Sequence, residues 1–209
     1  GVFEEKMEDR KKDRRFTLLI FGGSQGAHAI NQFVIESLER LLPLKDELRF
    51  LHQTGEKDRE IVAAAYLERG FEAEVSPFIV DMATAYRSAD LLVCRAGATS
   101  IAEITAGGKA AILIPFPFAA ADHQTRNAEV LAGAGAAEMI PERELNGRRL
   151  ADAIERIYHD PGAVRRMEAA AAALGRRRAA ADIVDACLEL VQARETSAEC
   201  CVLGMGAPV

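Results

Sequence analysis

Short apolar runs alternate along this chain with longer segments in which apolar residues recur at helical spacing. The runs FTLLIF, LLVC and AILI are continuously apolar, a pattern typical of parallel strands that helices cover on both faces. Strands that alternate with helices in this way indicate a parallel sheet. The six strands that we expect are Phe16–Phe21, Leu48–Gln53, Ala73–Pro77, Leu91–Cys94, Ala111–Ile114 and Ala136–Ile140.

Helical patterns fill the gaps between these strands, which predicts an α/β fold with a doubly wound, parallel, six-stranded sheet. After the last strand the pattern is purely helical. At Asp160-Pro161 a new helix is expected, because proline suits the first turn of a helix. The expected helices are Ala27–Leu42, Asp58–Arg69, Met82–Ser88, Ser100–Ala106, His123–Ala134, Gly147–Asp160, Pro161–Leu174 and Ala179–Gln192.

The length of 209 residues and the hydrophobic content of 49% fit a single domain better than two. Residues 1–15 are dense in charges of both signs, so we expect a solvated linker that follows a missing N-terminal domain. Residues 16–192 form the predicted domain. Residues 193–209 have no readable periodicity and form a C-terminal tail.

The net charge of −6 argues against a surface built for nucleic acid. The four cysteines show no CxxC spacing, and a chain of this size needs no disulfide framework, which favours a reducing, cytoplasmic setting. The longest uncharged apolar run, Ala110–Ala121, has about half of the ~20 residues that a membrane span requires. The sequence therefore predicts neither a transmembrane helix nor a signal peptide.

A glycine-rich segment, GGSQGA, follows the first expected strand. Gly22, Gly23 and Gly26 allow positive φ angles and let backbone N–H groups approach a phosphate. The segment lacks the GxGxxG fingerprint and the lysine of a P-loop, so NAD and ATP are not expected. A tight turn without a ligand is the alternative.

The loop after the fourth expected strand, RAGATSIAE, has two interpretations. In the structural one, Thr99 or Ser100 caps the next helix, and Ser100 with Glu103 forms a capping box. In the functional one, the helix N-terminus binds a diphosphate, and Glu103 accepts hydrogen bonds from both hydroxyls of a ribose. The residues alone leave both open.

The segment PFPFAAADHQTRN follows the fifth expected strand and changes abruptly from apolar to polar. Asp122, His123, Gln124 and Asn127 offer mixed donors and acceptors, as a sugar ring with many hydroxyls requires. An ordinary helix start capped by Asp122 is the alternative. The other three histidines show no ligand-like spacing with His123, so we expect no metal site and no cofactor.

Four segments, GGSQGAHAIN, SPFIVDMATAY, CRAGATSIAE and ADHQTRNAEVL, occur in this order at a spacing that resembles the C-terminal, donor-binding domain of the MurG family. The resemblance covers about Phe16–Gln192. Members of this family transfer N-acetylglucosamine (GlcNAc) from UDP-GlcNAc to lipid I and so make lipid II for peptidoglycan synthesis. The resemblance implies the Rossmann-like C-terminal half of a GT-B glycosyltransferase, peripheral on the cytoplasmic face of the bacterial membrane when the enzyme is whole.

The resemblance also implies roles for residues in each loop. The glycine-rich segment would lie against the diphosphate, Phe78 and the backbone of Ile79 would form the uracil pocket, and Glu103 would hold the ribose. The polar segment after the fifth expected strand would face the sugar, and Gln124 would form hydrogen bonds with its hydroxyls. The implied donor-binding residues are Gly23, Ser24, Gln25, Gly26, Phe78, Ile79, Ala98, Thr99, Ser100, Glu103, His123, Gln124 and Asn127.

Two departures from the family pattern bear on these roles. Many relatives have DNHQ where this chain has ADHQ, so Ala121 and Asp122 replace the usual carboxylate and amide beside the sugar. The family's N-terminal domain, which carries a second glycine-rich loop, the general base and the surface for lipid I and the membrane, is missing. We therefore assign no base and expect the chain alone to be inactive.

The family mechanism is an inverting displacement without a metal ion, in which backbone amides and a helix dipole meet the charge on the diphosphate. Two other functions fit the same segments. One is the donor domain of another UDP-sugar transferase, and the other is a nucleotide-sugar-binding module with no catalytic role.

Overall fold

The computed structural model describes residues 15–23, 26–176, 179 and 181–190 of the chain. The chain divides into two compact units, Gly1–Gly175 and Arg176–Val209. In the second unit, residues 181–190 are helical and exposed. Nearly all of the expected linker, the whole of the expected tail, and Ser24 and Gln25 lie outside the described residues, and the domain boundaries expected from the sequence stay a prediction.

The first unit contains a six-stranded sheet in the order β3-β2-β1-β4-β5-β6, and each neighbouring pair is parallel. Leu18 of the central strand pairs with Phe50 on one side and with Leu91 on the other. The strands are β1 (Phe16–Phe21), β2 (Leu48–Gln53), β3 (Glu72–Ser76), β4 (Leu91–Cys94), β5 (Ala111–Leu113) and β6 (Ala137–Met139).

Helices connect successive strands and then continue past the sheet. Three short 3-10 segments, η1 (Leu42–Leu44), η2 (Ala120–Asp122) and η3 (Glu142–Glu144), were not expected from the sequence. The α-helices are α2 (His28–Leu41), α3 (Arg59–Glu68), α4 (Met82–Ser88), α5 (Ala98–Gly107), α6 (His123–Gly133), α7 (Gly147–His159) and α8 (Pro161–Leu174).

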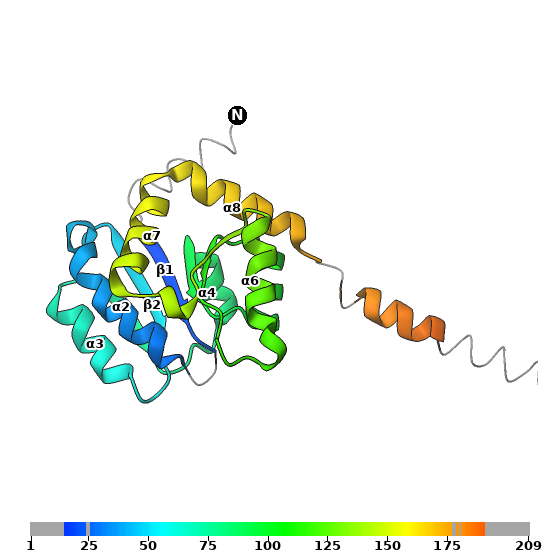
Figure 1. Cartoon of the computed structure of the whole chain (residues 1–209), viewed down its shortest axis with the longest axis horizontal. Helices are drawn as coiled ribbons and strands as arrows, with labels where there is room; N and C mark the ends of the chain where they lie inside the picture. The colour runs from blue at the N-terminus through cyan, green and yellow to red at the C-terminus, as the bar shows by residue number, and fades with distance from the viewer. Residues whose placement is uncertain (1–14, 24–25, 177–178, 180, 191–209) are drawn as a thin grey trace, which may run out of the picture. The chain divides into compact units, whose positions relative to one another are not determined.

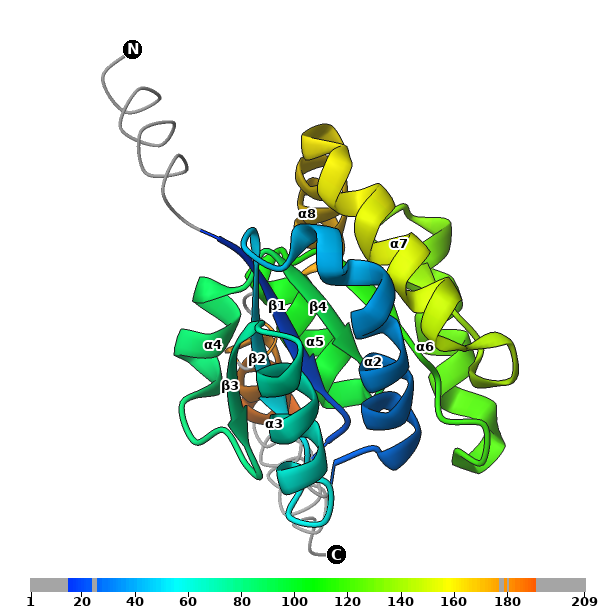
Figure 2. The ribbon, with the colours of Figure 1, turned by 90° about the vertical axis from the view of Figure 1, so that its left-hand side faces the viewer.

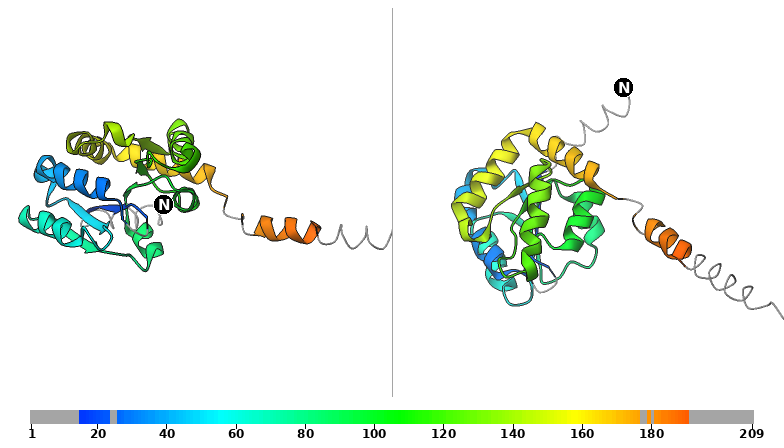
Figure 3. Two further views of the ribbon diagram at one scale, coloured as in Figure 1. Left: turned by 60° about the horizontal axis from the view of Figure 1, so that its bottom comes forward. Right: turned by 45° about the vertical axis from the view of Figure 1, so that its right-hand side comes forward.

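The helices form two layers with the sheet between them (Figures 1 and 3). One core cluster joins α2, α3 and α7 to one face of the sheet, through side chains such as Ile30, Tyr66 and Ile154. The other joins α4, α5 and α6 to the opposite face, through side chains such as Ile104 and Leu131. Helices α2 and α7 lie side by side on the first face (Figure 2). The doubly wound α/β fold expected from the sequence is therefore confirmed.

The expected start of a helix at Asp160-Pro161 is also confirmed. Pro161 is the first residue of α8, where the absent N–H of proline costs no hydrogen bond. The Asp160 carboxylate accepts hydrogen bonds from the N–H groups of Gly162 and Ala163, at 2.9 and 3.1 Å. Side-chain capping thus fixes the turn between α7 and α8.

Candidate functional site

The strand order reverses between β1 and β4, so the loops after these two strands lie next to each other at the carboxyl edge of the sheet. In open parallel sheets, ligands bind at such a point. The two loops are the glycine-rich segment and the segment that begins at Arg95. These are the two segments expected from the sequence to bind phosphate, and the fold brings them together.

The three glycines of the first loop differ in backbone conformation and in the space that a Cβ atom would have. Gly23 and Gly26 have positive φ angles, 101° and 77°, as expected. Gly22 does not have a positive φ angle, so the expectation was wrong for this residue. A Cβ on Gly22 would lie 2.1 Å from the Cβ of Ala27, and one on Gly26 would lie 2.1 Å from the carbonyl oxygen of Thr54. A Cβ on Gly23 would meet no protein atom within 4 Å. Gly22 and Gly26 therefore allow close packing, while Gly23 borders open space that a ligand could enter.

Helix α5 begins at Ala98, with Gly97 in the N-cap position and no side-chain hydrogen bond to the first turn. The structural interpretation of this loop, a capping box of Ser100 and Glu103, is therefore wrong, because Ser100 already lies inside the helix. The chain turns at Gly97 instead, whose backbone is extended at φ −65° and ψ 152°. A helix start without a side-chain cap leaves N–H groups and the positive end of the dipole to face an anion.

Glu103 lies farther along α5 and is exposed. The hydroxyl of Tyr86, on α4, donates a hydrogen bond to Oε2 of Glu103 at 3.0 Å. Burial raises the pKa of Tyr86, with smaller contributions from Cys94 and Glu103, so the phenol keeps its proton and remains a donor. This bond orients the Glu103 carboxylate from the buried side.

The segment after β3 carries Phe78, which is 55% exposed, and Ile79. Both border a cavity of about 270 Å³ beside α4, which Glu74 and Asp81 also line. The N–H of Ile79 donates to Oε1 of Gln53 at 2.8 Å. A ligand contact through this N–H must therefore share or displace that bond, whereas the Ile79 carbonyl has no such constraint.

The loop after β5 contains two consecutive non-glycine residues with left-handed backbone, Ala121 at φ 50° and Asp122 at φ 53°. Asp122 stands at the N-cap of α6, but its side chain accepts no backbone N–H. Its Oδ1 accepts instead from the hydroxyl of Thr125 at 2.6 Å, so capping by Asp122 in the ordinary sense is wrong. Asparagine and aspartate tolerate this conformation better than alanine does, which places backbone strain at Ala121.

The polar side chains of α6 that the resemblance places against the sugar have protein partners. Oε1 of Gln124 accepts from the N–H of Phe116 at 3.0 Å, and Nδ2 of Asn127 donates to the carbonyl of Ala96 at 3.0 Å. Nδ1 of His123 lies 2.8 Å from the carbonyl oxygen of Ala120. The amide group of Gln124 can still donate to a hydroxyl, while Asn127 chiefly ties α6 to the loop after β4.

Arg95, to which the sequence analysis gave no role, joins three segments at the carboxyl edge of the sheet. Its NH1 donates to the carbonyls of Ile114 and Pro115, each at 3.2 Å, and its guanidinium pairs with Glu142. The same group lies over the ring of Phe116, 5.2 Å from the centroid. Its position directly after a buried strand is the signal that could have marked it.

A buried polar network lies beneath the first loop. His52, fully buried, contacts Oδ1 of Asn31 through Nε2 at 3.0 Å and the hydroxyl of Tyr66 through Nδ1 at 3.1 Å. Nδ2 of Asn31 donates to Thr54 and to Asp58, so its Oδ1 must accept from Nε2–H of His52. Burial, opposed in part by Asp58, lowers the pKa of His52 to about 3. His52 is thus a neutral structural side chain.

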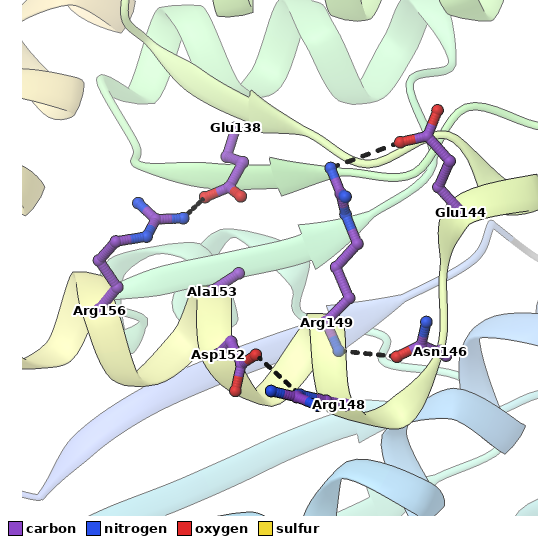
Figure 4. A pocket seen from close by; sticks show the side chains of 8 residues that line it. All are labelled: Glu138, Glu144, Asn146, Arg148, Arg149, Asp152, Ala153 and Arg156. Carbon is purple, nitrogen blue, oxygen red and sulfur yellow. Dashed lines mark hydrogen bonds and ion pairs between the residues drawn. The ribbon is translucent and has the colours of Figure 1, made fainter.

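A cavity of about 380 Å³ lies between β6 and the start of α7 (Figure 4). Its arginines are paired: Arg149 with Glu144 at 3.5 Å, Arg148 with Asp152 at 3.6 Å, and Arg156 with Glu138 at 2.5 Å. Carboxylates thus neutralise the positive charge that would attract a diphosphate. In the described part of the chain, no group of three or more histidine, cysteine or acidic residues could hold a metal ion.

Fold and loops together define a doubly wound, Rossmann-like α/β domain with its candidate ligand site at the reversal of strand order. Comparison with known families narrows this class. The chain belongs to the glycosyltransferase family 28 C-terminal domain, whose model matches residues 17–184.

Two curated relatives carry the same name, UDP-N-acetylglucosamine--N-acetylmuramyl-(pentapeptide) pyrophosphoryl-undecaprenol N-acetylglucosamine transferase. The protein of Syntrophus aciditrophicus is 59% identical over 192 residues, which are 92% of this chain and 53% of the relative. That of Trichlorobacter lovleyi is 52% identical over 87% of this chain and 48% of its own length. The chain thus spans about half the length of the curated relatives it matches.

A crystal structure of MurG from Acinetobacter baumannii matches the fold with a TM-score of 0.72 and 34% identity. The match covers 84% of this chain and 52% of that protein. The resemblance to the MurG family that the four sequence segments indicate is therefore confirmed.

Proposed function

We propose that this domain binds UDP-GlcNAc and forms the donor half of an inverting, metal-independent glycosyltransferase, which transfers GlcNAc to lipid I and makes lipid II. One observation carries the proposal: the glycine loop and the uncapped start of α5 converge where the strand order reverses between β1 and β4. The names of the relatives support the choice of donor and acceptor.

The diphosphate is proposed to lie between the open side of Gly23 and the first turn of α5, at Ala98, Thr99 and Ser100. The helix N-terminus carries roughly half a positive charge, which favours an anion there. Ser24 and Gln25 are proposed to complete the contact from the glycine loop, whose turn Gly26 permits.

The uridine is proposed to extend from the diphosphate toward the ends of β2 and β3. The Glu103 carboxylate, oriented by Tyr86, has an exposed side for the two ribose hydroxyls. The uracil ring is proposed to pack beside Phe78, with a backbone hydrogen bond at Ile79. The sugar is then proposed to lie beside His123 and Gln124, where the side-chain amide of Gln124 donates hydrogen bonds to its hydroxyls.

In the proposed reaction, a base removes the proton of the acceptor hydroxyl, and that oxygen forms a bond to the anomeric carbon. The bond from this carbon to the diphosphate breaks, and its electron pair leaves with UDP. The N–H groups at the start of α5 would stabilise the growing negative charge. We assign no residue of this chain as the base, which is proposed to belong to the other half of the enzyme.

Acceptor binding and attachment to the inner face of the bacterial membrane are likewise proposed for that other half. Among the helices that the structure describes, none is long and apolar enough to cross a membrane.

The test is calorimetric titration of the 209-residue chain with UDP-GlcNAc, UDP-glucose, UDP-galactose and NAD, followed by a transfer assay with a lipid I analogue. We expect binding of UDP-GlcNAc, no binding of NAD, and transfer only when the separately expressed N-terminal half is added. A chain that binds no UDP would refute the donor-domain proposal, and transfer by this chain alone would contradict the division of labour between the halves.

A further inference from the structure

Gln53 lies at the carboxyl end of β2 and connects two loops that the proposed function places at opposite ends of the nucleotide. The side chain is almost completely buried, with 3% of the residue exposed. Its Nε2 donates to the carbonyl oxygen of Gly23 at 2.8 Å, and its Oε1 accepts from the N–H of Ile79 at 2.8 Å. One amide group thus bridges the glycine loop after β1 and the segment after β3.

The chemistry of the partners fixes the orientation of this amide. The NH₂ group must face the Gly23 carbonyl, and the carbonyl must face the Ile79 N–H, because the reverse arrangement would pair acceptor with acceptor and donor with donor. A leucine or methionine of similar size would fill the space, but it would leave the Ile79 N–H unsatisfied and remove one of the two bonds to the Gly23 carbonyl.

Both bonds fix peptide units that border the proposed ligand. The Gly23 carbonyl accepts from Gly26 N–H at 3.0 Å as well as from Gln53, so two bonds hold a glycine at φ 101°. In a planar trans peptide the C=O and the N–H point in opposite directions. The bond to Ile79 therefore turns the Phe78 carbonyl away from Gln53.

Other hydrogen bonds join the ends of β2 and β3, and the hydroxyl of Thr54 also donates to the carbonyl of Ser76, at 3.4 Å. The N–H of Thr54 donates to the carbonyl of Ser76 at 3.0 Å, and the N–H of Gly55 donates to the carbonyl of Pro77 at 3.1 Å. These bonds join the ends of β2 and β3 but do not reach Gly23. In the described residues, the Gln53 side chain is the hydrogen-bonded bridge from Gly23 to Ile79.

We propose that Gln53 is a positioning residue that couples uracil binding to phosphate binding, an inference that rests on the proposed function. A base that orders the segment at Ile79 also holds the Gln53 amide, and the amide holds the Gly23 carbonyl in the geometry that the phosphate needs. Coupling of this kind is reciprocal, so phosphate must tighten uridine binding by the same factor as uridine tightens phosphate binding.

The experiment measures the dissociation constant of uridine with and without saturating inorganic phosphate. Inorganic phosphate is the probe for one phosphate group of the donor, and uridine is the probe for the nucleoside. For the unmodified chain, we expect phosphate to tighten uridine binding about tenfold, within the range of known couplings. Gln53→Met removes both hydrogen bonds and should reduce this factor to about one, since the sites then bind independently.

Two further variants separate coupling from stability. Gln53→Glu keeps an acceptor for the Ile79 N–H, and its carboxylate, at a pH where it is ionised, has no donor for Gly23. Under that condition uridine alone should bind nearly as before, while the effect of phosphate disappears. Ser37→Ala is the matched control, because it also removes a buried hydrogen bond, from the Ser37 hydroxyl to Val34 at 2.7 Å, within α2. It should lower the melting temperature and leave the coupling unchanged.

Failure of this inference differs from failure of the proposed function. If the unmodified chain binds UDP but phosphate does not change uridine affinity, the coupling is refuted and donor binding stands. Full coupling in Gln53→Glu or Gln53→Met would refute the role of Gln53, as would an equal loss in Ser37→Ala. Should Gln53→Met not fold, Gln53→Glu decides between these results.

Discussion

Glu103→Gln tests the proposed ribose contact, because it keeps the shape of the side chain and removes its charge. A hydrogen bond to a charged group contributes about 1.5–3 kcal/mol, against about 0.5–1.5 kcal/mol between neutral groups. Loss of the charge should therefore weaken UDP binding by roughly 1–2 kcal/mol, which is about five- to thirtyfold in the dissociation constant. The fold should be little affected, because Glu103 is exposed and caps no helix.

Calorimetric titration of Glu103→Gln with UDP and with 2′-deoxy-UDP checks this prediction. The substitution should cost less for 2′-deoxy-UDP, which lacks one of the two hydroxyls that the carboxylate is proposed to hold. Glu60→Gln makes the same chemical change on the first turn of α3 and should leave UDP affinity unchanged. An equal loss for both nucleotides, or a drop of about 1 kcal/mol in unfolding free energy without loss of affinity, would refute the assignment.

Four other predictions concern the loops and the buried network. Gly26→Ala puts a Cβ against a carbonyl and should lower the free energy of unfolding by about 1–3 kcal/mol. Gly23→Ala should instead weaken UDP binding more than uridine binding, and equal losses would contradict a phosphate role. Ala121→Asn relieves a left-handed alanine and should raise the free energy of unfolding by roughly 0.5–1 kcal/mol in urea titrations. His52 has a pKa of about 3 in the fold, against an ordinary value of 6.5. Protons therefore favour the unfolded chain, so stability should fall below about pH 6.5 by up to about 1.4 kcal/mol per pH unit. A His52→Gln variant should lack this slope, and its persistence would assign the slope to another group.

The parts of the fold that the sequence predicts well are those decided by local burial. Phe16–Phe21 and Leu91–Cys94 are predicted to the residue, because strands buried on both faces are apolar throughout and end where polar or glycine residues begin. The start of α5 was predicted two residues late. The hydroxyls of Thr99 and Ser100 suggested a cap, whereas the chain turns at Gly97 without one.

The residues that the sequence did not reveal, Gln53 and Arg95, form hydrogen bonds to backbone groups that lie far away along the chain. Gln53 bonds to Gly23 and Ile79, which are 30 and 26 residues away. Arg95 bonds to carbonyls 19 and 20 residues away. Neither periodicity nor local motifs report such pairings, because the partners are peptide groups that every residue carries. A polar side chain at the end of a buried strand was the available signal, and both residues have it.

The electrostatics of the proposed site depend on which groups of these polar residues are already hydrogen-bonded. The guanidinium of Arg95 stands at the end of β4, yet Glu142 and two backbone carbonyls occupy its hydrogen-bonding groups. Its charge at this edge of the sheet is therefore already paired with that of Glu142. The positive potential for a diphosphate then has to come from oriented peptide N–H groups, whose effect depends on exact direction. We therefore expect uncharged or neutralised side chains such as Gln53 and Arg95, which fix the direction of peptide units, to affect binding of the proposed ligand without contacting it. The dependence on direction also implies that substitutions which tilt these peptides should reduce affinity for UDP more than for uridine, even where the net charge of the domain is unchanged.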